Sequence, residues 1–277
     1  MAVVVVTDSS ASLPAESVDE LGIVVVPLHV LVDGREVTDG DEIDYSSTTV
    51  TTSAPSPGEL CAAYRRALAL SAGDGVVAVH LSRQLSATWE AGRQAVQELD
   101  AGDRVRLVDS LSAGLGTGLA VLAAARQAHA GASLEQVFAA AQSAAARGRA
   151  FIMVNRTEQL RRGGRLSTAA AFFGTELVTK PLLQLVDGRL ELREKARTRS
   201  KAYAKLVAAA VDAAGGDGAA VAVQHLGAPE AAETIVTRLI ELLPGIRELI
   251  TAEFGPSLAV HLGAGAVGVL VVPGGCD

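Results

Sequence analysis

The stretch VVAVHLSRQLSATWEAGRQAVQELDAGDRVRLVDS, residues 76–110, contains the pattern that decides the fold. An apolar run of strand length at 76–80 is followed by a segment of helical periodicity at 86–99 and a second apolar run at 105–108. Apolar runs that alternate with helical segments are typical of βαβ units, in which the strands are parallel. The stretch therefore predicts an α/β fold with a mostly parallel sheet.

The alternation continues toward the N-terminus and through the middle of the chain. Apolar runs at 3–6 and 23–32 are expected to be strands on either side of a short helix that begins after Pro14. Further helices are expected from periodicity at 59–70, 119–129 and 134–146. Together with the βαβ unit, these elements predict an N-terminal domain with an open, mostly parallel sheet and flanking helices.

The second half of the chain has a different order of elements. A strand is expected at 150–154, and a hairpin at 183–192 has the turn dipeptide Asp187-Gly188 at its tip. A helix that ends at Ala214 and a strand at 219–224 follow. A hairpin beside helix-connected strands predicts a C-terminal α/β domain with a mixed sheet.

The length of 277 residues also favours two domains, since it exceeds the usual size of one core. We predict an N-terminal α/β domain over 1–150 and a C-terminal α/β domain over 151–277. The polar segment 39–57 is rich in Ser and Thr, and we expect a long functional loop that can pack on the other domain. Proline, histidine and glycines interrupt the uncharged segment 254–272, so we expect buried loop plus strand rather than a membrane span.

Composition and charge exclude several classes of function. Hydrophobic residues make up 49% of the chain but aromatic residues only 3%, so stacking platforms for bases are scarce. The formal net charge of −7 gives no global attraction to nucleic acid or to an anionic membrane. Cys61 and Cys276 have no zinc-site spacing and fit a reducing compartment. We therefore expect a soluble, cytoplasmic monomer that binds no nucleic acid and no metal and touches membranes only transiently.

Polar side chains follow three of the predicted strands. These segments are Thr7-Asp8-Ser9-Ser10, Ser86 with Thr88, and Asp109-Ser110. In doubly wound sheets, ligands bind beyond the carboxyl ends of the strands, where helix N-terminal amides favour anions. The alternative for each segment is a turn with a capping Ser or Asp. The glycines that follow the third segment lack the spacing of a dinucleotide or phosphate loop.

Three further segments carry side chains suited to an anion. Thr52 and Ser53 offer hydroxyl groups, although the segment also fits an ordinary proline-rich loop. Arg165 lies in an Arg-Gly-Gly-Arg turn that suits an anion or a partner's phosphate, and a solvated helix end is the alternative. His261 lies in an apolar, glycine-rich segment, where a lone histidine is more often a satisfied core residue.

The order of these motifs along residues 3–272 resembles the DegV family, which includes the fatty-acid-binding subunits of bacterial fatty acid kinase. The matching elements are Thr7-Asp8-Ser9-Ser10, Thr52-Ser53-Ala54-Pro55-Ser56-Pro57, Leu85-Ser86-Ala87-Thr88-Trp89, Asp109-Ser110, Gly163-Gly164-Arg165-Leu166-Ser167, Lys180-Pro181, Arg197-Thr198-Arg199, and His261 with Gly263, Gly265 and Gly268. The sequence departs from the family's usual glutamine, glycine, tyrosine, threonine and proline at Ala54, Ala87, Trp89, Leu262 and Ala264, respectively. These departures change the shape expected for the head-group pocket.

The resemblance implies a carrier that buries one long-chain fatty acid between its two domains. The hydroxyl groups of Thr52, Ser53 and Ser86 would hold the carboxylate in a hydrogen-bonded network that reaches His261. The further candidates for the pocket are Asp8, Ser9, Ser10, Thr88, Ser110, Phe172, Phe173, Leu262 and Gly263. The segment 182–185 is a further candidate for the tunnel wall, because its leucines suit an alkyl chain.

By the same resemblance, the protein is not an enzyme but presents the carboxyl group to the kinase subunit of a fatty acid kinase. That subunit brings ATP and magnesium, and the acyl-phosphate product serves phospholipid synthesis. Arg165 would stand near the mouth of the tunnel and assist the kinase reaction rather than grip the lipid. The chain itself would need no cofactor, in agreement with its lack of a phosphate-binding fingerprint.

Two other classes of function remain open from the sequence. The first is a serine hydrolase or acyltransferase, with Ser86 or Ser9 as nucleophile, His261 as base and Asp8 or Asp109 to orient the base. The sequence lacks a Gly-x-Ser-x-Gly elbow, which weakens this alternative. The second is a regulator that binds a small acidic metabolite or nucleic acid.

Overall fold

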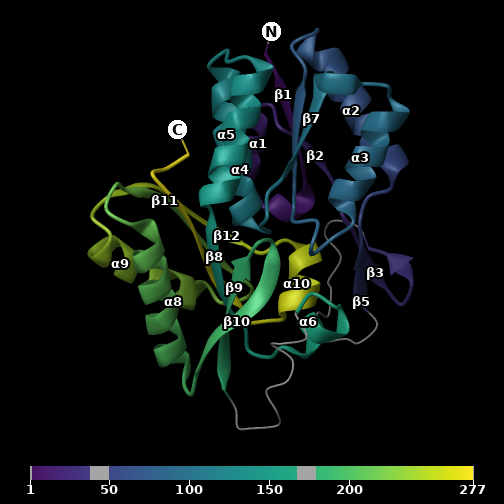
Figure 1. The fold of residues 1–277 in the computed structure, drawn as a ribbon. Coiled ribbons are helices and arrows are strands. Elements are labelled where there is room, and N and C mark those ends of the chain that lie inside the picture. The colour runs from purple at the N-terminus through teal and green to yellow at the C-terminus, as the bar shows by residue number, and fades with distance from the viewer. Residues whose placement is uncertain (1, 38–49, 167–178, 277) are drawn as a thin grey trace. The chain divides into compact units, whose positions relative to one another are not determined.

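The computed structural model describes residues 2–37, 50–166 and 179–276 (Figure 1). The chain divides into two compact units, of which the first comprises Met1–His29, Ser53–Arg147 and Cys276–Asp277 and the second comprises Val30–Thr52 and Gly148–Gly275. The segment 30–52 of the N-terminal half therefore belongs to the second unit. Helices and sheets occur in both units, which confirms the predicted α/β class.

The first unit is built on a four-stranded sheet whose strands are all parallel. In sheet order, the strands are β2 (Val24–Val26), β1 (Val4–Asp8), β6 (Val76–His80) and β7 (Val105–Asp109). The helices are α1 (Ala15–Glu20), α2 (Pro57–Ser71), α3 (Thr88–Glu98), α4 (Leu115–His129) and α5 (Leu134–Arg147), with 3-10 turns η1 (Ser9–Ala11) and η2 (Gly102–Arg104). Figure 1 shows α2 and α3 on one side of the sheet and α4 and α5 on the other. Strand β6 is buried at every position, as a parallel strand covered on both faces must be.

Two sequence signals explain where α2 begins. Pro57 occupies the first turn, where a missing N–H group costs no hydrogen bond. Ser56 and Glu59 form a capping box, in which the Glu59 amide donates to Ser56 Oγ (3.3 Å) and the Ser56 amide donates to Glu59 Oε2 (2.8 Å). From this start, α2 buries Leu60 and Tyr64 in the core of the first unit.

A three-stranded sheet contains, in order, β4 (Arg35–Glu36), β3 (His29–Val32) and β5 (Val50–Ser53). Asp33 and Gly34 form the turn between β3 and β4, with positive φ angles of 51° and 78° that suit a two-residue hairpin loop. Part of the segment 39–57, expected to be a loop, is therefore strand. Residues 38–49 lie outside the described residues.

The prediction of a single strand at 23–32 is wrong. The structure has two strands there, β2 and β3, and they belong to different sheets. Pro27 lies between them and lacks the N–H group that a continuous ladder would need. The apolar run therefore contributes one strand to each of two sheets.

The second unit contains a six-stranded mixed sheet, as predicted for the C-terminal half. In sheet order, the strands are β10 (Arg189–Ala196), β9 (Lys180–Val186), β8 (Arg149–Met153), β13 (Val267–Pro273), β11 (Ala219–His225) and β12 (Ile246–Glu253). The β11–β12 pair is parallel, while the other neighbours are antiparallel. The helices described in this unit are α6 (Glu158–Arg162), α8 (Arg199–Ala214), α9 (Pro229–Leu242) and α10 (Pro256–Leu262). The hairpin with Asp187 and Gly188 at its tip is confirmed.

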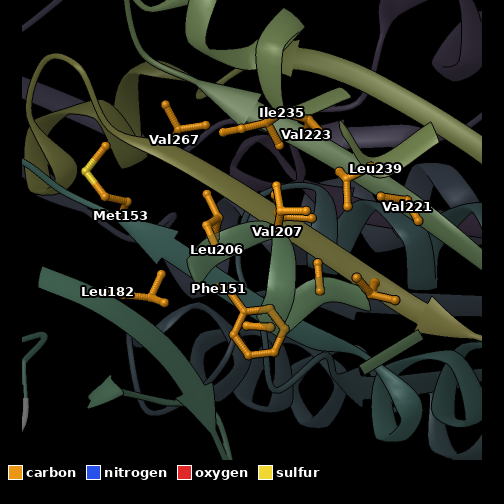
Figure 2. Close-up of a cluster of buried hydrophobic side chains, with 14 of the residues drawn as sticks. Phe151, Met153, Leu182, Leu206, Val207, Val221, Val223, Ile235, Leu239 and Val267 are labelled. Atoms are coloured by element: carbon orange, nitrogen blue, oxygen red, sulfur yellow. The ribbon is translucent and has the colours of Figure 1, made fainter. Parts of the chain in front are cut away.

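The core of the second unit lies between its sheet and the helices α8 and α9 (Figure 2). Its fully buried side chains include Met153, Leu182, Leu206, Ile235 and Leu239. The segment 254–272 was expected to be loop plus strand, and the loop part of this prediction is wrong because α10 occupies it. None of the helices in the described part of the chain is both long and apolar enough to cross a membrane.

Candidate functional site

Asp8 lies at the end of β1, where its side chain is fully buried. Its Oδ1 atom accepts hydrogen bonds from the amide (3.2 Å) and the hydroxyl group (2.5 Å) of Ser10. Its Oδ2 atom accepts from Nδ1 of His80 (2.9 Å) and from the amide of Leu81 (3.1 Å). Asp8 thus joins the ends of the neighbouring parallel strands β1 and β6.

His80 and Tyr64 extend this group of buried side chains, which we call the Asp8 cluster (Asp8, Ser10, Tyr64 and His80). Nε2 of His80 lies 2.7 Å from the Tyr64 hydroxyl oxygen. Burial, followed by the charge of Asp8, raises the pKa of the Tyr64 phenol well above its usual value. Gly92 on α3 makes room for the phenol, since a Cβ atom at position 92 would lie 2.6 Å from the Tyr64 hydroxyl oxygen.

Ser86 lies in the loop between β6 and α3, close to the Asp8 cluster in sequence. The Ser82 amide donates to the Ser112 carbonyl (2.8 Å), and the Ser82 carbonyl accepts from the Ser86 amide (3.1 Å). The hydroxyl oxygen of Ser86 lies 2.9 Å from that of Thr88 and accepts weakly from the Thr88 amide (3.3 Å). Helix α3 begins at Thr88, so Ser86 lies just before the helix and not at its first residue, where the periodicity had placed it.

Asp109 repeats at the end of β7 the turn that Asp8 makes at the end of β1. Its Oδ1 atom accepts from the amide two residues ahead, that of Leu111 (3.0 Å), and its Oδ2 atom pairs with Nε of Arg83 (3.2 Å). The neighbouring Ser110 is buried and its hydroxyl oxygen lies 2.8 Å from that of Thr117. Unlike Asp8, Asp109 has a partly exposed ionic partner, because the Arg83 side chain is 55% exposed.

The second unit contains a different polar pair. Oγ1 of Thr52, on β5, lies 2.8 Å from Nε2 of His261, on α10. Val30 on β3, Val50 on β5 and Val260 on α10 form a small buried cluster that packs the three-stranded sheet against α10. The positions of Thr52 and His261 therefore depend on neighbouring residues that pack together.

His261 is held in its neutral form. Burial, followed by the positive charge of Arg165, lowers the pKa of the imidazole from 6.5 to about 4. The guanidinium group of Arg165 donates to the carbonyl of Gly163, in the turn that follows α6. Gly163 also leaves space for the imidazole, because a Cβ atom at this position would lie 2.9 Å from Nδ1 of His261.

The residues predicted for the site are distributed over both units. Thr52, His261, Arg165, Leu262 and Gly263 belong to the second unit, and Asp8, Ser9, Ser10, Ser53, Ser86, Thr88 and Ser110 belong to the first. The Ser9 hydroxyl oxygen accepts from the Leu28 amide (2.8 Å). Leu262 is buried at the end of α10, and Gly263 follows the helix with a positive φ angle of 72°. Phe172 and Phe173 lie outside the described residues.

Sequence reasoning missed Tyr64, His80 and Gly92, and it named Gly163 only as part of the motif around Arg165. A glycine inside a helical pattern was the available signal for Gly92, since such a glycine often marks a close approach by another group. His80 is the last residue of the apolar run at 76–80, and no local pattern marks its side chain as functional. Among the described residues, no group of three or more His, Cys, Asp or Glu side chains could hold a metal ion.

A cavity of about 720 Å³ lies in the second unit beside the start of α9. Its lining includes Asn155, Arg199, Tyr203 and Glu230. Thr52, Arg165 and His261 do not line it. This cavity is therefore separate from the Thr52–His261 pair.

The fold and the Asp8 cluster define a class of α/β protein in which polar side chains gather where parallel strands end. The chain belongs to the DegV family, whose model, described as "Uncharacterised protein, DegV family", matches residues 2–274. A DegV domain-containing protein of Mycobacterium tuberculosis is 47% identical over 274 residues, which cover 98% of this chain and 97% of the relative.

Two solved structures of the family are similar along the whole chain. A DegV family protein from Thermus thermophilus, described by its fatty acid binding, is 32% identical with a TM-score of 0.91, and the match covers 99% of this chain and 100% of that one. DegV from Bacillus subtilis, described as a fatty acid binding protein, is also 32% identical, with a TM-score of 0.84 and coverage of 98% and 99%.

Proposed function

We propose that this protein binds one long-chain fatty acid and presents its carboxyl group to a partner kinase, which forms an acyl-phosphate for phospholipid synthesis. The kinase would supply ATP and magnesium, and the chain itself would need no cofactor. We further propose that it works in the cytoplasm as a monomer, with transient membrane contact and no nucleic-acid partner. The Thr52–His261 pair carries the proposal, because it supplies a hydroxyl group fixed by a neutral imidazole in a protein whose relatives bind fatty acids.

The energetics of a buried fatty acid support this proposal. About fifteen methylenes at about 0.8 kcal/mol each give a gross hydrophobic gain of about 12 kcal/mol, before the costs of ordering. An ionised carboxylate taken from water needs hydrogen-bond donors in return. In the proposal, Thr52, Ser53 and Ser86 provide hydroxyl donors. Nε2–H of His261 donates to Thr52 Oγ1, which leaves the Thr52 proton for the ligand.

Extraction under denaturing conditions followed by mass spectrometry tests the proposal. Protein purified from a bacterial host is expected to release one fatty acid per chain. Protein that repeatedly carries no fatty acid, and that binds none when the acid is added to it, would rule the proposal out.

Removing the Thr52 hydroxyl group is expected to weaken fatty acid binding. Thr52→Val keeps the shape of the side chain but removes the donor, so we expect the dissociation constant to rise about tenfold. Thr51→Val is the matched control, because Thr51 is the exposed neighbour on the same strand. Titration with a fluorescent fatty acid measures both constants. Equal affinity in the two variants would contradict the role given to Thr52.

Arg165 is expected to act in phosphoryl transfer and not in retention of the lipid. Arg165→Ala should keep its fatty acid, yet acyl-phosphate formation with the kinase should fall at least about tenfold, as loss of a charge-assisted contact predicts. Arg162→Ala serves as the control, since Arg162 is an exposed residue at the end of α6. Normal turnover by Arg165→Ala, or loss of its lipid, would contradict this assignment.

The alternative of a serine hydrolase or acyltransferase gains no support from the two polar groups. Either Asp8 or Asp109 was expected to orient the base, but Asp8 bonds to His80 and Asp109 pairs with Arg83. His261 bonds to Thr52. Intact mass after incubation with an activated acyl ester separates the two functions. A carrier is expected to show no covalent adduct on Ser9 or Ser86, whereas an acyl-enzyme would show one.

A further inference from the structure

We propose that Asp8 is a positioning residue for the bound carboxyl group, because it fixes the start of the loop that carries Ser86. This inference rests on the proposed function. Asp8 does not touch the ligand in this proposal. It acts through the backbone of the loop 81–87, which connects β6 to α3.

The contact between Asp8 and the loop is short and buried. Oδ2 of Asp8 accepts from the amide of Leu81, the first residue after β6, at 3.1 Å. Ser82 follows directly, and its carbonyl accepts from the amide of Ser86 at 3.1 Å. Two hydrogen bonds and the two consecutive residues between them therefore lead from the Asp8 carboxylate to Ser86.

The other members of the Asp8 cluster also hold the carboxylate, Ser10 at Oδ1 and His80 at Oδ2. His80 donates from Nδ1 to Asp8 (2.9 Å), while its Nε2 atom lies 2.7 Å from the hydroxyl oxygen of Tyr64. Tyr64 comes from α2 and is packed against Gly92 of α3. Any shift of Asp8 would thus disturb buried groups on two helices and two strands. Asp8 therefore holds the Leu81 amide, and with it the start of the loop, in a fixed position.

The order hydroxyl, imidazole, carboxylate in this cluster also occurs in nucleophilic triads. Here Tyr64, His80 and Asp8 are all 0% exposed, so a substrate does not reach the hydroxyl group. The donors around Asp8 instead come from the backbone and from side chains of the same unit. The arrangement therefore fits a positioning role and not catalysis.

Asp8→Asn tests the inference. The asparagine keeps the shape of the side chain but places an NH₂ group where an oxygen now accepts, so a donor faces the Leu81 or the Ser10 amide. The dissociation constant for a fluorescent fatty acid is expected to rise about tenfold in Asp8→Asn and about tenfold in Ser86→Ala. The double variant should bind no worse than Ser86→Ala alone, since both changes remove the same contact.

Ser71→Ala is the control, because Ser71 makes buried hydrogen bonds to the Leu68 carbonyl and the Gly75 amide at the end of α2, and these involve neither the Asp8 cluster nor the loop. It should keep the wild-type dissociation constant within about twofold, although it loses a buried hydrogen bond of similar kind. If Asp8→Asn does not fold, Ser10→Ala takes its place, with an expected rise of about threefold that also disappears in the Ser86→Ala background.

The outcomes separate the inference from the function on which it rests. Equal dissociation constants for Asp8→Asn and Ser71→Ala would overturn the positioning role while fatty acid binding stands. Effects of Asp8→Asn and Ser86→Ala that multiply in the double variant would do the same. A wild-type protein that binds no fatty acid overturns the proposed function and the inference together.

Discussion

Leu182→Ala is expected to lower the free energy of unfolding by about 3 to 4 kcal/mol. Leu182 is fully buried on β9, opposite Met153 of β8 and within the same core cluster as Leu206 (Figure 2). Protein interiors are closely packed, so an alanine there leaves a cavity that its neighbours fill only in part. Denaturant unfolding of the fatty-acid-free protein measures the loss.

Leu185→Ala provides the control on the same strand. Leu185 is only partly buried, and we expect a loss of about 1 kcal/mol. The pair also separates two roles for the segment 182–185, which the sequence offered as a tunnel wall. Truncation of a wall residue would change the affinity for the lipid and leave the empty protein almost as stable. A loss below about 1 kcal/mol in Leu182→Ala would therefore favour the wall over the core.

Helices and strands were predicted correctly where a short stretch of sequence determines them, and less well where they depend on the rest of the fold. The run at 76–80 defines β6 because a parallel strand covered on both faces needs apolar side chains throughout. The same rule fails at 23–32, where one apolar run serves two sheets and Pro27 alone marks the break. The proline, histidine and glycines of 254–272 predicted a loop before the strand. Proline in the first turn and glycine after the last are instead the usual boundaries of a helix, here α10.

The polar groups were harder to predict because they depend on which strands are neighbours. Asp8 and His80 each end a strand, but strand order is a property of the whole sheet and is absent from the local sequence. The pairing of Thr7 with Val79 brings the two side chains together. Thr52 and His261 are 209 positions apart, and no local pattern connects them. The family resemblance named both residues, whereas the structure supplies the contact.

His261 is expected to make the stability of the protein depend on pH. The folded protein keeps this imidazole neutral, with its pKa lowered from 6.5 to about 4 by burial and by Arg165. An unfolded chain takes up a proton at His261 once the pH falls below 6.5, whereas the folded protein does so only near pH 4. The unfolded state therefore binds more protons within this window, and the folded state loses relative stability as the pH falls through it.

The loss attributable to His261 is expected to be absent above pH 6.5 and to reach about 3 kcal/mol at pH 4. Many carboxyl groups also titrate near pH 4, so the fatty-acid-free wild type has to be compared with a variant that lacks the imidazole. His261→Gln is suitable, because its side chain keeps an amide nitrogen for Thr52 but does not titrate. Denaturant unfolding from pH 7 to 4 should show wild type losing about 3 kcal/mol more than this variant. Parallel curves would mean that burial does not hold His261 neutral. The hydrogen bond to Thr52 would remain, because a protonated imidazole also donates from Nε2, but the proposed carboxylate site would then carry a positive charge below pH 6.5.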